Sequence, residues 1–151
     1  MPQFRFFLDT SALFAGIWSA KGGGRLLLRL GEAGHVQLLL SSAVLQELET
    51  AFARKAPALL PQVALLLHLA RVQVVPEPDP DVVQQVMVWL PHPGDARVLA
   101  AALASRPDFF VTLDRQHFLH NPQLTTSRVP FPIGTPGDAL QWWRARILSA
   151  D

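Results

Sequence analysis

The 151-residue sequence contains no cysteine. This absence excludes disulfide bonds, thiolate zinc sites and a cysteine nucleophile, and it is consistent with a reducing compartment. Charged residues are also few, at 17% of the total, and the formal net charge is only +1. Because this total is close to neutral, it argues neither for nor against nucleic-acid binding, and any basic surface must be local.

Long hydrophobic runs are missing as well. The longest segment without Asp, Glu, Lys or Arg covers residues 56–70 and contains Pro57 and Pro61. It is shorter than the roughly 20 residues that a membrane-spanning helix needs. The N-terminal apolar run is broken at Asp9, unlike a signal peptide. We therefore expect a soluble, cytoplasmic protein without a membrane segment, forming a single domain over residues 1–151.

Short apolar segments alternate with helical segments along the chain. We expect strands at 3–8, 36–40, 72–75, 109–113 and 129–133, and helices at 11–18, 25–33, 43–55, 57–71, 81–90, 95–106 and 135–148, with a helical turn at 115–119. Pro130 and Pro132 restrict the fifth strand to an edge. The alternation indicates an α/β fold whose parallel sheet of about five strands is covered by helices on both faces.

Two acids directly follow predicted strands. Asp9 closes the first strand and Asp114 closes the fourth. The carboxyl ends of parallel strands lie on one edge of a sheet, where α/β proteins bind ligands. The two acids therefore share an edge, and they are close together if their strands are neighbours. Asp9 has an alternative role as the cap of the next helix, since Asp, Thr and Ser are all good N-caps.

Two further acids are expected on helices near the same edge. Asp95 opens an alanine-rich helix that leads into the fourth strand, although an acid at a helix start also stabilises the helix dipole by about 0.3–1 kcal/mol. Glu47 is expected nearer the core than Glu49, because it lies three residues from Val44 on the apolar face. Clustered carboxylates repel one another unless a cation neutralises them. Oxygen-only ligands favour Mg²⁺ or Mn²⁺.

Four motifs in this order resemble those of the PIN-domain nucleases over nearly the whole chain. They are LDTSAL at 8–13, LSSAVLQEL at 40–48, DARVLAAA at 95–102 and FVTLDR at 110–115. The ending PIGTP at 132–136, followed by a helix, is also similar to the close of these domains. The resemblance implies a three-layer α/β/α fold with strand order 3-2-1-4-5.

The resemblance also implies a function and a set of site residues. The family's four acids match Asp9, Glu47, Asp95 and Asp114, and two supporting polar positions match Ser11 and Thr112. The expected activity is that of a Mg²⁺- or Mn²⁺-dependent endoribonuclease acting on RNA. Many single-domain members are toxins paired with a small antitoxin protein, and the chain looks closest to this branch. The extra acids that the branch often carries are replaced here by Pro93-Gly94 and Gln116.

Other residues have weaker functional readings. His117 follows Asp114 by three residues and is a candidate proton carrier. One of Trp142 and Trp143 is expected in the core, and the other at an interface or stacked on a base. The apolar helix 59–69 predicts either deep burial or a subunit interface, and we favour a homodimer. Five arginines are candidates for phosphate contacts, with a solvated surface as the default: Arg25, Arg29, Arg97, Arg115 and Arg128.

Alternative functions are less consistent with the sequence. An aspartyl phosphatase requires a second acid at the position of Ser11, and a receiver domain requires a late lysine, whereas no lysine follows Lys55. The glycines at 22–24 follow a helix and lack the Lys-Ser end of a phosphate-binding loop. The remaining alternative is a non-cleaving PIN-like protein that acts as an RNA-binding or assembly scaffold.

Overall fold

The centre of the molecule is a five-stranded sheet, seen in a computed structural model that describes residues 3–149. The strands are β1 (Phe4–Leu8), β2 (Val36–Ser41), β3 (Gln73–Val75), β4 (Phe109–Val111) and β5 (Ile133–Gly134). All four neighbouring pairs are parallel. Their order, β3-β2-β1-β4-β5, confirms the predicted order and makes β1 the central strand.

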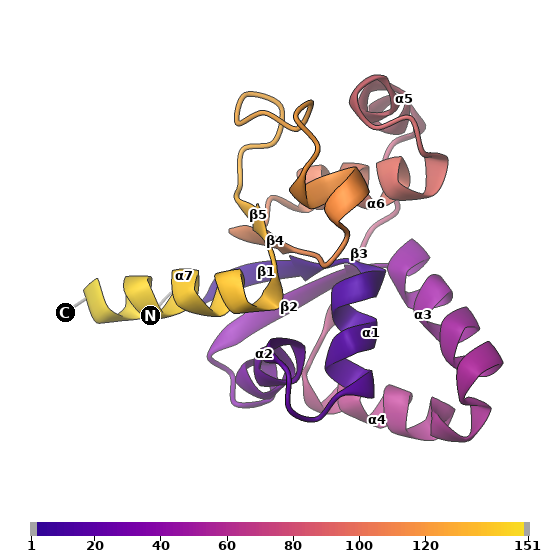
Figure 1. Cartoon of the computed structure of the whole chain (residues 1–151), viewed down its shortest axis with the longest axis vertical. Coiled ribbons are helices and arrows are strands. Elements are labelled where there is room, and N and C mark those ends of the chain that lie inside the picture. Colours follow the sequence, from indigo (N-terminus) through magenta and orange to yellow (C-terminus); the bar gives the residue numbers. More distant parts are fainter. Residues whose placement is uncertain (1–2, 150–151) are drawn as a thin grey trace.

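Helices cover both faces of the sheet (Figure 1). They are α1 (Thr10–Trp18), α2 (Gly23–Glu32), α3 (Ser42–Lys55), α4 (Leu60–Leu69), α5 (Pro80–Trp89), α6 (Pro93–Ser105) and α7 (Pro136–Ser149). A 3₁₀ turn, Pro57–Leu59, precedes α4, and a short π-helix, Arg115–Leu119, follows β4. In Figure 1, α1 and α2 lie on one side of the sheet, and α5 and α6 lie on the other.

The side chains of β1 show why two helical layers form. Successive strand residues point to opposite faces. Phe6 makes edge-to-face contacts with Phe109 and with Trp142 of α7, whereas Phe7 stacks on Phe110, which in turn packs against Phe118 of the π-helix. Because both faces of the strand are apolar, both require cover, as in other parallel sheets.

Two predicted strands are shorter in the structure. The fourth was expected to reach residue 113, but β4 ends at Val111. The Thr112 N–H still donates to the Gly134 carbonyl of β5. The next two N–H groups donate to side chains, that of Leu113 to Ser11 Oγ and that of Asp114 to Thr112 Oγ1. The fifth strand is reduced to Ile133–Gly134 at the edge of the sheet, because the two preceding prolines have no N–H to donate.

The predictions for the apolar helix and the tryptophans have mixed outcomes. In α4 only Val63 and Leu67 are buried, and Leu65 is 54% exposed, so deep burial was wrong and the homodimer stays a prediction. Trp142 packs against the core as expected. Trp143 also packs against it, with its ring 6.2 Å from that of His35. Within residues 3–149, no helix has the length and apolarity needed to cross a membrane.

Candidate metal and nucleic-acid site

Asp9 lies at the carboxyl end of the central strand with its carboxylate enclosed by donors. Its Oδ1 accepts hydrogen bonds from the Ala12 N–H at 3.0 Å and from Ser11 Oγ at 2.7 Å. Its Oδ2 accepts one from Thr112 Oγ1 at 2.5 Å. Asp9 is therefore the N-cap of α1, as the alternative reading proposed. Capping uses only one oxygen, however, and the other faces β4.

Burial dominates the electrostatics of Asp9. The side chain is 6% exposed, and loss of hydration raises the pKa of its carboxyl from 3.8 to about 6. The hydrogen bonds from Thr112, Ala12 and Ser11 oppose this rise, and the charge of Asp114 adds to it. A carboxylate with so high a pKa is an unfavourable buried charge, and a nearby cation would relieve it.

Thr112 and Ser11 join the two strand ends that carry the acids. Thr112 is fully buried and continues the β1–β4 pairing, in which Leu8 lies opposite Val111. Its hydroxyl donates to Asp9 and accepts from the Asp114 N–H, while Ser11 Oγ accepts from the Leu113 N–H. These bonds hold Asp9 and Asp114 on adjacent strand ends, which is the placement that the sequence predicted.

Asp114, Asp95 and His117 form a tight group beside Asp9. Nδ1 of His117 lies 2.6 Å from Asp95 Oδ2 and 3.3 Å from Asp114 Oδ2. Asp114 also caps the π-helix by accepting from the His117 N–H at 3.0 Å. Desolvation raises the pKa of Asp95, and the charge of Asp114 adds to the rise, while His117 opposes it. The sequence identified His117 as a residue that could face the cleft, but not this contact with both acids.

Glu47 reaches the site from the opposite wall. Its Oε2 accepts a hydrogen bond from Thr10 Oγ1 at 2.7 Å, and its Oε1 lies 3.9 Å from where a Cβ on Gly94 would stand, at the start of α6. Glu47 and Glu49 are both exposed, so burial does not separate the two acids. Only Glu47 lines the cleft, because Glu49 points to a different hollow beside α4.

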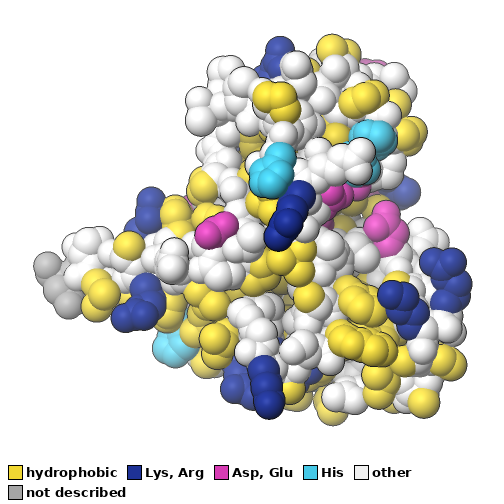
Figure 2. Space-filling view, viewed as in Figure 1, with side chains coloured by type: hydrophobic (Ala, Val, Ile, Leu, Met, Phe, Trp, Pro, Cys, Tyr) yellow, Lys and Arg dark blue, Asp and Glu magenta, His cyan; other side chains and the backbone are white. Residues whose placement is uncertain are grey.

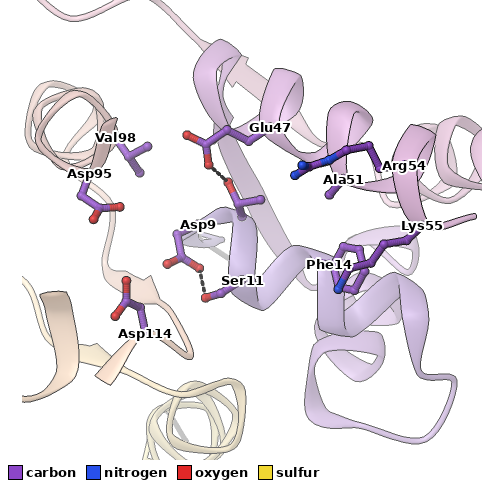
Figure 3. A pocket seen from close by; sticks show the side chains of 11 residues that line it. Asp9, Ser11, Phe14, Glu47, Ala51, Arg54, Lys55, Asp95, Val98 and Asp114 are labelled. Atoms are coloured by element: carbon purple, nitrogen blue, oxygen red, sulfur yellow. Dashed lines mark hydrogen bonds between the residues drawn. The ribbon is translucent and has the colours of Figure 1, made fainter. Parts of the chain in front are cut away.

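The four predicted acids surround one open cleft of about 540 Å³. Figure 3 shows Asp95 and Asp114 on one wall, Asp9 at the floor and Glu47 on the facing wall. The other charged residues that line the cleft are Arg54 and Lys55, with Phe14 beside them. The sequence analysis missed these three. The signal available was helical spacing, since Ala51, Arg54 and Lys55 follow Glu47 by four, seven and eight residues.

Of the five arginines considered for phosphate contacts, three have partners within the protein. Arg25 donates to the carbonyls of Gly16 and Ile17 at the end of α1. Arg97 pairs with Glu77 at 2.7 Å, and Arg128 bonds to Gln123. None of the five lines the cleft.

The donor atoms fit a divalent cation. One carboxylate oxygen each from Asp95 and Asp114 and one ring nitrogen of His117 all lie within 4.8 Å of one another. Such a mixed oxygen and nitrogen set suits a divalent ion of the first transition row, and carboxylates alone also suit Mg²⁺. Asp9, buried next to Asp114, adds a further negative charge on the same side.

Solved structures resemble this fold. The chain matches VapBC2 from Rickettsia felis, bound to a DNA fragment from its promoter, with 17% identity and a TM-score of 0.64, over 87% of this chain and 98% of that chain. It matches PAE2754 from Pyrobaculum aerophilum with 19% identity and a TM-score of 0.66, over 94% and 90%. It matches VapC20 of Mycobacterium tuberculosis, a sarcin-ricin loop cleaving toxin, with 20% identity and a TM-score of 0.54, over 76% and 94%. At these identities the likeness establishes the fold.

A comparison with curated protein sequences gave no match. A comparison with protein families gave one, to the family described as PIN domain, over residues 5–116. This segment contains β1 from its second residue, β2, β3 and β4, and all four predicted acids. Since it also spans most of the chain, the protein belongs to the PIN domain family.

Proposed function

We propose that this protein is a Mg²⁺- or Mn²⁺-dependent endoribonuclease that hydrolyses phosphodiester bonds of RNA. The observation that carries the proposal is the convergence of Asp9, Glu47, Asp95 and Asp114, from four separate parts of the chain, on one cleft. Membership of the PIN domain family supports a nuclease. Acidic residues that had only separate structural roles would not need to line the same cavity.

Each residue has a role that follows from its position. Asp95, Asp114 and His117 would hold the cation, with Asp9 as the central charge between the strand ends. A bound divalent cation would supply Lewis-acid polarisation of the phosphate and a water of lowered pKa. Glu47, held by Thr10 on the facing wall, would orient the attacking water. Thr112 and Ser11 would keep the Asp9 carboxylate oriented through their hydrogen bonds.

The structural neighbours support a more specific biological role. One is described as a sarcin-ricin loop cleaving toxin, and another as VapBC2 bound to a DNA fragment from its promoter. We extend the proposal to the toxin of a toxin–antitoxin pair, with a small antitoxin protein as its inhibitor. The alternative is a non-cleaving scaffold that binds RNA. A complete set of four acids around the cleft favours cleavage.

A cleavage assay on single-stranded and structured RNA tests the proposal. We expect cleavage with Mg²⁺ or Mn²⁺ and none with chelator. Glu47→Gln should lower the rate by at least about tenfold, as loss of a residue that orients a reactant does. Glu49→Gln is the matched control, because this exposed acid lies on the same helix outside the cleft. RNA binding without metal-dependent cleavage would favour the scaffold instead.

A further inference from the structure

A groove with a basic and aromatic wall extends from the acidic site. The cleft that contains the four acids is also lined by Phe14, Ala51, Arg54 and Lys55. Figure 3 shows this group on the side away from Asp95 and Asp114. In Figure 2, Lys and Arg side chains lie over α3 next to hydrophobic surface, with acidic side chains close by. The proposed metal site occupies one end of this groove only.

One wall of the groove is a single face of α3. Ala51, Arg54 and Lys55 follow Glu47 at helical spacing. Arg54 and Lys55 are exposed in the last turn of this helix, where cations are also favoured by the helix dipole. The face therefore begins with an acid at the proposed metal site and ends with two positive charges about two turns away.

The other wall is a single face of α1. Thr10 and Phe14 line the cleft, and Trp18 follows Phe14 by four residues, one turn beyond the cleft lining. The Phe14 and Trp18 rings are stacked, 5.6 Å apart with 13° between their planes, and Phe14 also packs on Phe52 at 4.7 Å. Trp18 remains 53% exposed although it is the largest side chain on this face. Nζ of Lys55 lies 5.2 Å from the centre of the Phe14 ring, which joins the two walls.

We propose that this groove binds the single-stranded segment of RNA that flanks the bond to be cut. The inference rests on the proposed function. Arg54 and Lys55 would contact phosphates next to the scissile one, and Trp18, supported by Phe14, would stack on an unpaired base. Base-on-aromatic stacking beside a positively charged groove is the usual way in which proteins hold single strands.

The charges and the shape both favour RNA over an acidic protein segment. Phosphates match the two cations, and the groove continues directly into the acids proposed to cut the strand. A segment made of Asp and Glu would pair with Arg54 and Lys55 but has no flat ring for the exposed face of Trp18. The bases of a double-stranded RNA are already stacked on one another, so they are not free to stack on Trp18. The groove thus makes an unpaired substrate segment the preferred one.

Binding of a short fluorescein-labelled oligouridylate, in chelator to prevent metal-dependent cleavage, tests the inference. Arg54→Gln and Lys55→Gln should each weaken binding at low salt. Each should also reduce the slope of log K against log salt by about 0.7, the value per phosphate contact on a single strand. Trp18→Ala should weaken binding about tenfold, as loss of one stacked base does. All three side chains are exposed, so a thermal melt should show the variants folded.

Arg144→Gln is the charge-matched control for each single variant, because this exposed arginine lies on α7, away from the groove. If the Arg54 and Lys55 variants bind like this control, the inference is overturned. Equal binding of polyglutamate and RNA by the wild type would overturn the role of Trp18. Cleavage of RNA by the wild type, together with unaffected binding by the groove variants, would support the proposed function and overturn the groove. RNA binding that depends on the groove residues, without any cleavage, would support the groove and contradict the proposed function.

Discussion

Asp9 has a structural role and also carries a buried charge. It caps α1 and joins β1 to Thr112, yet it is nearly inaccessible to water. Its raised pKa means that the folded state binds a proton more tightly than the unfolded state does. The stability that Asp9 contributes is therefore present below its unfolded pKa near 3.8, and it is lost as the pH rises through about 6.

The first prediction concerns Asp9→Asn, which keeps the shape and removes the charge. The pKa of Asp9 is about two higher in the folded protein than the ordinary value of 3.8. This difference corresponds to about 3 kcal/mol, at 1.36 kcal/mol for each pKa unit. In chelator, wild-type unfolding free energy should fall by about this amount relative to the variant between about pH 4 and about pH 7. Urea unfolding across this range measures the difference. A difference that is independent of pH would show that Asp9 is not an unfavourable charge in the folded protein.

The second prediction concerns His117, whose ring nitrogen lies within reach of both Asp95 and Asp114. Imidazole suits transition-metal ions better than Mg²⁺. Titration calorimetry should show tighter binding of Mn²⁺ than of Mg²⁺, and His117→Gln should narrow that preference by about tenfold, the size of effect typical of groups around a metal. His120→Gln, on an exposed neighbour, should leave it unchanged. An unaltered preference in the His117 variant would remove the residue from the ligand set.

At this scale the sequence could predict much of the acidic site. Asp9 and Asp114 were placed by the rule that the carboxyl ends of parallel strands lie on one edge of the sheet. Asp95 was placed at the same edge because it starts the helix that leads into the fourth strand. His117 was harder: a helical turn was predicted at 115–119, but its π-helical form, on which the position of the ring depends, was not. Arg54 and Lys55 required knowing that α3 faces α1 across the cleft, which is a property of the tertiary structure.

Among the elements, α1 and α2 are packed unusually close. A Cβ on Gly16 would lie 2.8 Å from the Gly24 carbonyl carbon, so neither helix has room for a side chain here. The glycines at 22–24 lie between the helices predicted at 11–18 and 25–33, but Gly23 and Gly24 are helical. The sequence could not reveal this, because glycine permits both close packing and a flexible loop.

The third prediction is that Gly16→Ala destabilises the protein by about 1–3 kcal/mol, the usual cost of overpacking. The backbone of α2 would have to move away from α1. Gly137→Ala is a matched control in the first turn of α7, where the new Cβ finds only ordinary contact at 3.7 Å, and it should stabilise by up to about 1 kcal/mol. Urea unfolding compares them. Equal effects of the two substitutions would contradict the close packing.

Helix starts were among the more predictable features of the elements. Ser41 caps α3 by accepting from the Val44 N–H at 3.1 Å. Thr135 caps α7 by accepting from the Asp138 N–H, and the Asp138 carboxylate accepts from the Thr135 N–H in return. Strand ends were less predictable, because side-chain acceptors such as Ser11 and Thr112 take over the backbone donors after β4.

For the whole molecule, the strand order decides whether a site exists. Because β1 lies between β2 and β4, the residues after β1 and β4 are adjacent, and the helix after β2 faces them. Alternation of strands and helices predicts a parallel sheet, whereas this strand order was implied by the resemblance to PIN domains. The lining of the cleft beyond the acids depends on how the helices pack, and this could not be read from periodicity alone.

The fourth prediction is that the protein is a homodimer formed through α4. Leu65 and Leu69 are 54% and 39% exposed on a helix rich in leucine, and a second copy would cover them. Leu65→Glu should produce a monomer in sedimentation equilibrium. Val88→Glu is the control, since Val88 is 80% exposed on α5 and its substitution should leave the dimer intact. A monomeric wild type would refute the prediction.

The central claim is that four acids around one cleft cut RNA with the help of a divalent cation. The most direct test is the single-turnover cleavage rate of the wild type and of Asp114→Asn, before and after chelation and re-addition of Mn²⁺. We predict that chelator abolishes wild-type cleavage, that Mn²⁺ restores it, and that Asp114→Asn is slower by at least about 100-fold, as expected for loss of charge at a metal-assisted site. Cleavage that persists in chelator, or an Asp114→Asn variant as fast as the wild type, would contradict the claim.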